Sequence, residues 1–125
     1  MLKSKSADIQ VFPGFFSHTA EVFKDLARTG FWPLTLVTKG GEAQPPHHHD
    51  TVSHAYIVEG KVVVTDLSKN IDHCLGSGDK IIIPAGSRHV EKETTGKVIY
   101  IIAIPEARPL REFLRPIEDE GDRKR

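Results

Sequence analysis

Histidine is the residue that this sequence concentrates where chemistry could take place. Six of the seven histidines lie between His47 and His89. On a β-strand, residues i and i+2 point to the same face, so His47 and His49 are expected to project together. His54 opens the next apolar run, and His89 opens a later one. If these strands curl into a barrel, four imidazoles can converge in its interior.

A group of imidazoles inside an apolar shell predicts a bound metal ion. A buried polar group without a partner costs about 1–3 kcal/mol, and burial lowers the pKa of a histidine because it disfavours the charged ring. A neutral imidazole nitrogen is a good ligand for Fe, Mn, Ni, Cu or Zn, whereas Mg and Ca prefer oxygen. We therefore expect one divalent transition metal, bound by His47, His49, His54 and His89. The alternative is that residues 47–49 form a polar surface loop.

Four neutral ligands would leave the charge of the ion uncompensated. Such a site is expected to attract an anionic ligand such as an enolate or a carboxylate. Two side chains in phase with the histidines are candidates for acid–base catalysis beside that ligand: Tyr56 shares the face of His54, and Glu93 shares the face of His89. The alternatives are that Tyr56 packs in the core and that Glu93, with Glu91, lies at an exposed strand end.

The placement of all these residues depends on a series of short β-type runs. The runs are rich in Val, Ile and Thr and are separated by turns that contain glycine. Many short strands at this spacing predict an all-β sandwich or barrel. The predicted strands cover residues 34–38, 54–58, 62–66, 80–83, 89–93 and 98–104.

The two ends of the chain are expected to pack around this barrel. Apolar residues at helical spacing predict one short helix over about residues 18–29, which Gly30 would end. We therefore divide the chain into an N-terminal arm and helix (1–33), a barrel core (34–105), and a C-terminal segment with a charged tail (106–125). Apolar residues in the C-terminal segment, Phe113 among them, are expected to pack on the outside of the barrel.

Composition and charge narrow the class of protein. The 125 residues suit a single domain, and Lys plus Arg equal Asp plus Glu at 17 each. We expect a small-molecule ligand, some tendency to self-associate, and no nucleic-acid or membrane partner. The single cysteine, Cys74, excludes an internal disulfide. No signal peptide is visible, and residues 98–104 are too short to span a membrane, so a cytoplasmic location is the default expectation.

Two stretches of the sequence resemble the paired motifs of the cupin family. The first family motif is G-x5-H-x-H, then three or four residues and E, then about six residues and G. Here five residues separate Gly41 from His47, the first histidine of the H-x-H pair, and Gly60 ends the segment. His54 stands at the usual glutamate position if four residues intervene. The stretch from His54 to Gly60 is then one residue shorter than the common form, so Ser53 is an alternative for the inward position.

The second family motif is G-x5-P-x-G-x2-H-x3-N. It matches from Gly78 through Pro84 to His89, and Glu93 stands at the asparagine position. The two matches together cover about residues 41–93. They indicate the fold and a bound metal more specifically than they indicate a reaction.

The resemblance implies an all-β cupin fold, the double-stranded β-helix or jelly-roll barrel of RmlC-like proteins, with one short N-terminal helix. All-histidine cupin sites are similar to those of several dioxygenases. The expected function is therefore that of a metal-dependent enzyme, best described as a dioxygenase-type oxidoreductase, acting on a small oxygenated or anionic organic substrate. An isomerase or sugar-acid-processing cupin and a non-catalytic sensor of a small molecule are the alternatives. The resemblance also implies a homodimer.

Overall fold

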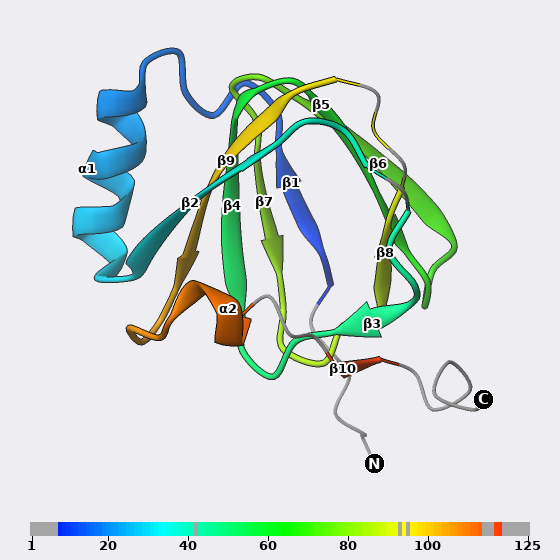
Figure 1. Cartoon of the computed structure of the whole chain (residues 1–125). Helices are drawn as coiled ribbons and strands as arrows, with labels where there is room; N and C mark the ends of the chain where they lie inside the picture. Colours follow the sequence, from blue (N-terminus) through cyan, green and yellow to red (C-terminus); the bar gives the residue numbers. More distant parts are fainter. Residues whose placement is uncertain (1–7, 42, 93, 95, 114–116, 119–125) are drawn as a thin grey trace.

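The computed structural model describes residues 8–41, 43–92, 94, 96–113 and 117–118, which form two facing antiparallel sheets (Figure 1). The first sheet contains, in spatial order, β1 (Gln10–Phe12), β7 (Lys80–Ile83), β4 (Ser53–Glu59), β9 (Val98–Ile104) and β2 (Trp32–Thr38). The second contains β10 (Ile117–Glu118), β3 (His47–His48), β8 (His89–Glu91), β5 (Lys61–Asp66) and β6 (Ile71–Gly76). The predicted all-β jelly-roll architecture is confirmed.

The predicted strands are found with small shifts at their ends. β7 and β9 have the predicted bounds, β2, β4 and β5 are longer by one or two residues, and β8 ends at Glu91. The sequence did not predict β6, because this edge strand buries little more than Leu75 and has no clear apolar alternation. The turn between β4 and β5 requires Gly60, since its φ is +99° and a Cβ there would lie 2.4 Å from the carbonyl oxygen of Lys97.

Apolar side chains from both sheets fill much of the barrel interior. Val62 and Val64 of β5 are buried against Ile57 of β4 and Ile81 of β7. Burial of a side chain of this size stabilises the fold by about 1.5–3 kcal/mol. This cluster joins the two sheets and leaves a cavity whose other walls carry polar groups.

Helix α1 (Thr19–Thr29) packs on the outer face of the first sheet (Figure 1). Its buried residues Val22 and Leu26 join Ile101 and Ala103 of β9 in a second apolar cluster. The helix ends as predicted, because Gly30 adopts a left-handed conformation and donates its N–H to the carbonyl of Leu26.

The C-terminal segment does not pack on the outside as expected. Helix α2 (Leu110–Phe113) lies at the end of the barrel where β3 lies (Figure 1). Phe113 is 5% exposed and packs inward against Ile102 and Ile104 of β9, whereas the apolar residues on the outer face of this sheet already pack against α1. Neither described helix has the length and apolar character needed to cross a membrane.

Candidate metal centre

Three of the four histidines that the sequence predicts as ligands lie together. His47 on β3 is directly opposite His89 on β8, and His49 follows immediately after β3. The ring centroids of His47 and His89 are 4.5 Å apart, and the His49 ring lies 5.3 Å from His47 and 5.8 Å from His89. One possible ligand atom of each residue lies within 4.8 Å of the other two. The three imidazoles are therefore close enough to share a single ion.

Backbone carbonyls fix the rings of two of these histidines. His47 Nδ1 lies 2.7 Å from the carbonyl oxygen of Pro45, and His89 Nδ1 lies 2.9 Å from that of Ser87. Because a carbonyl only accepts, Nδ1 donates in both rings, and Nε2 keeps a free lone pair. His89 is fully buried, and its Nε2 has no hydrogen-bond partner among the described residues. A divalent transition metal fits this arrangement, since it would satisfy the buried acceptor.

The surroundings keep the imidazoles of His49 and His89 neutral. Burial lowers the pKa of His49 to about 4, and the neighbouring His47 and His89 act in the same direction. Burial also lowers the pKa of His89 to about 4, against the opposing effect of its hydrogen bond to Ser87. The ring of Phe113 stacks on His49 with a centroid distance of 4.5 Å and an interplanar angle of 8°. Neutral, shielded imidazoles are the form that binds a metal.

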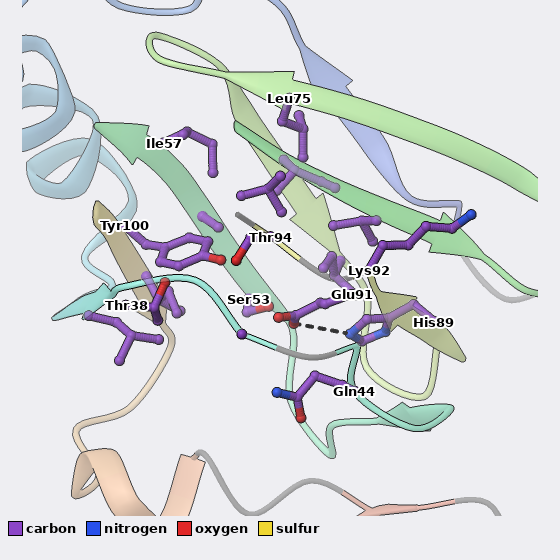
Figure 2. A pocket seen from close by; sticks show the side chains of 18 of the residues that line it. Thr38, Gln44, Ser53, Ile57, Leu75, His89, Glu91, Lys92, Thr94 and Tyr100 are labelled. Atoms are coloured by element: carbon purple, nitrogen blue, oxygen red, sulfur yellow. Dashed lines mark ion pairs between the residues drawn. The ribbon is translucent and has the colours of Figure 1, made fainter. Parts of the chain in front are cut away.

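A cavity of about 460 Å³ opens beside the histidines. Much of its wall is apolar and comes from β4, β5, β6 and β7, with Ile57, Val62, Val64, Leu75, Ile81 and Ile83 as lining residues. A few polar side chains from different strands face the same space, among them Ser53, Glu91 and Tyr100 (Figure 2). An apolar pocket with a few polar groups is typical of a site for a small organic molecule.

Glu91 is an acidic residue beside His89 that was not among the predicted ligands or catalytic residues. The sequence left two places open for it, the face of His89 and an exposed strand end; in the structure its carboxylate faces the cavity and its Oε2 lies 4.0 Å from His89 Nε2 (Figure 2). Desolvation raises the pKa of Glu91, and burial together with Glu91 raises the pKa of Tyr100 to about 12. The signal was present in the sequence, since Glu91 is two residues after His89 on the same strand face.

His54 does not join the other three histidines. The residues of β4 that line the cavity are Ser53, Ala55 and Ile57, so His54 faces the opposite side of the sheet. There its ring packs on Phe31 with a centroid distance of 4.6 Å, and burial lowers its pKa to about 4. The expected phase of β4 is therefore off by one residue, and a slip of one residue moves every side chain of a strand to the other face.

The same shift in phase removes Tyr56 from the cavity. Tyr56 is fully buried under α1, where its hydroxyl donates a hydrogen bond of 2.6 Å to Asp25 Oδ2. Lys80 Nζ lies 2.6 Å from the same oxygen, and Arg28 pairs with the other oxygen of Asp25. This cluster ties the helix to the sheet and is separate from the cavity. The other residue expected to catalyse, Glu93, lies outside the described residues.

Three imidazoles gathered inside a jelly-roll barrel, two of them held by backbone carbonyls, form a candidate metal site of the kind that the two motifs predict. The sequence signature of the cupin domain matches residues 34–104, so the chain belongs to the cupin family. The resemblance seen in the two motifs is thereby confirmed for family and fold.

Solved structures with the same fold are distant in sequence. A DUF861 family protein from Thermotoga maritima is 22% identical with a TM-score of 0.57, over 78% of this chain and 99% of that protein. RmlC from Streptococcus suis, solved with dTDP-D-xylose, is 13% identical with a TM-score of 0.53, over 78% of this chain and 55% of that one. The DMSP lyase DddQ from Ruegeria pomeroyi is 17% identical with a TM-score of 0.58, over 75% and 45%. No curated protein sequence matches this chain significantly.

Proposed function

We propose that His47, His49 and His89 bind one divalent transition metal and that the chain is a metal-dependent enzyme acting on a small oxygenated organic substrate. The observation that carries the proposal is the Nε2 atom of His89, which is buried without a partner while Nδ1 of the same ring contacts a carbonyl. A buried acceptor of this kind costs stability unless something binds it. Because the imidazoles of His47 and His49 lie beside this atom, a metal ion is the ligand that the chemistry favours.

The cavity indicates which substrates the site takes. When bound, the ion supplies Lewis acidity and, if it is redox-active, a route for electrons to dioxygen. The apolar walls suit a substrate with a hydrocarbon portion, and the oxygen atoms of that substrate are expected at the histidine end. Phe113 and α2 cover this end and limit the access of water to it. We take a dioxygenase-type reaction as the first activity to test.

Metal analysis tests the first half of the proposal. The untagged protein is purified, and its bound Fe, Mn, Ni, Cu and Zn are measured per chain. His47→Ala and His89→Ala are expected to lose the metal, whereas His18→Ala and His54→Ala are expected to keep it, since these two residues lie away from the cluster. Equal metal content in the wild type and all four variants would overturn the site.

Oxygen consumption tests the second half. The Fe(II)-loaded protein is presented with a panel of diketones, catechols and sugar acids, and the consumption of dioxygen and of substrate is followed. Turnover that disappears in His89→Ala supports the proposed enzyme. Isomerisation of a sugar acid without oxygen uptake would instead favour the isomerase alternative. Thermal stabilisation by a compound without any turnover would favour a sensor.

We also propose that the chain acts as a homodimer. Strand β2 is an edge of the first sheet and carries exposed apolar residues, Trp32 at 48% and Val37 at 52%. Unpaired edge strands with apolar side chains favour association. Light scattering coupled to size-exclusion chromatography gives the mass that checks this; a mass of one chain would contradict it.

A further inference from the structure

We propose that Glu91 is the fourth protein ligand of the ion, so that the carboxylate which the first cupin motif places on β4 is supplied here by β8. This inference rests on the proposed metal site and adds to it the residue that completes the ligand set. It replaces the all-histidine set with three imidazoles and one carboxylate.

The backbone brings Glu91 to the right side of the barrel. In the pairing of β8 with β5, His89 is opposite Asp66 and Glu91 is opposite Val64, so the two residues share one face of β8. Both line the cavity, and Figure 2 shows their side chains pointing toward each other. Oε2 of Glu91 lies 4.0 Å from Nε2 of His89. This separation is too long for a hydrogen bond and leaves room for an ion between the two atoms.

The surroundings of the Glu91 carboxylate favour the binding of a cation. Its contact within the described part of the chain is the one to His89 Nε2, and the Glu91 side chain is 38% exposed toward the open space of the cavity. A carboxylate that is partly withdrawn from water on a largely apolar wall is stabilised by a nearby positive charge. His89 Nε2 has no hydrogen-bond partner among the described residues. A single divalent ion would satisfy both groups.

The residue at the usual position cannot fill this role. Ser53 is the member of β4 that faces the cavity at that point, and the common number of six residues separates it from Gly60. Its side chain ends at a hydroxyl one carbon from the backbone, which has neither the charge nor the reach of a glutamate. Across the barrel, Glu91 provides both.

A carboxylate ligand also changes the preferred substrate. Three neutral imidazoles leave the ion with its full charge, whereas the addition of Glu91 halves the net charge of the site. A singly charged chelating oxygen ligand, such as a hydroxycarboxylate or an enediolate in its singly ionised form, then makes the site neutral. This is the class of substrate that we infer for the cavity.

Titration of the metal-free protein with Co²⁺ tests the inference without any substrate. Glu91→Gln is expected to bind Co²⁺ at least about tenfold more weakly, since even partners outside the ligand set affect metal affinity by about 10–100-fold. The visible absorption bands of the bound Co²⁺ are expected to shift, because a ligand atom is lost. The matched control is Glu112→Gln, which removes the same charge from the exposed face of α2 beside the neighbouring pocket. Its affinity and spectrum are expected to equal those of the wild type.

The possible outcomes separate this inference from the proposed function. If the wild type and Glu91→Gln bind Co²⁺ with equal affinity and identical spectra, Glu91 is not a ligand, while the histidine site stands. If the wild type binds no Co²⁺, the metal site itself is overturned. Thermal unfolding of the metal-free variants checks folding. If Glu91→Gln does not fold, Glu91→Asp replaces it: weaker binding with shifted bands supports the inference, and unchanged binding refutes it.

Discussion

His47 and His89 are joined by a shared pattern: they face each other across β3 and β8, and each ring contacts the carbonyl oxygen of the residue two positions earlier in the chain. The two contacts, to Pro45 and Ser87, therefore fix the tautomer and the rotation of both rings before any ligand arrives. A site whose ligands are held in this way loses little conformational entropy when an ion binds. The backbone next to each histidine therefore orients its ring for metal binding.

The phase of β4 can be tested by moving the carboxylate. In a Glu91→Gln background, adding Ser53→Glu is expected to restore much of the Co²⁺ affinity, because position 53 faces the cavity. Adding His54→Glu to the same background is expected to restore none, because position 54 lies against Phe31 on the other face. Calorimetric titration of both double variants gives the comparison. Recovery by His54→Glu alone would show that the strand phase described above is incorrect.

The ring that covers His49 is expected to slow the release of the ion. Phe113→Ala removes the stacked ring and a buried apolar side chain, which is expected to lower the free energy of unfolding by about 3 kcal/mol. Transfer of Co²⁺ to a chelator in excess is expected to be several-fold faster than in the wild type. Phe23→Ala serves as the control, because Phe23 is 54% exposed on α1. Equal release rates in the two variants would mean that Phe113 does not limit access.

The buried cluster under α1 predicts how the protein responds to acid. Burial acts to raise the pKa of Asp25, but its hydrogen bonds with Lys80, Tyr56 and Arg28 outweigh it and lower the pKa from 3.8 to about 2. A lowered pKa means stability that is complete above about pH 4 and is lost as the pH falls through about 2, on the order of 2 kcal/mol. Chemical denaturation between pH 5 and pH 2 measures this loss.

A variant isolates the contribution of Asp25 from those of other carboxylates. Asp25→Asn is expected to be less stable than the wild type at pH 7 by about 3–5 kcal/mol, because it leaves Lys80 buried without a counter-charge. Its stability is expected to change less between pH 4 and pH 2. The double variant Asp25→Asn, Lys80→Met is expected to recover part of the loss at pH 7. An unchanged acid response in Asp25→Asn would contradict the assignment to this residue.

Local sequence patterns predicted much of the fold and part of the candidate site. Runs of Val, Ile and Thr between glycine turns were sufficient for the main strands, because both signals act within a few residues. The H-x-H spacing placed His47 and His49 together for the same reason, and the second motif added His89 through the turn at Pro84. β6 was missed because an edge strand with exposed residues carries almost no pattern.

The sequence by itself determined the family, the barrel and the three clustered histidines, since these depend on spacings of a few residues. Only the tertiary structure decided which face of β4 points inward. It therefore decided that Ser53 lines the cavity and that His54 and Tyr56 do not. A strand repeats every two residues, so the short loop before Ser53 can set either phase, and the packing of α1 on one side and the cavity on the other selects between them. Glu91 also required the tertiary structure. The sequence places it on the same strand face as His89, but only the folded barrel shows that its carboxylate lies in the cavity beside that imidazole.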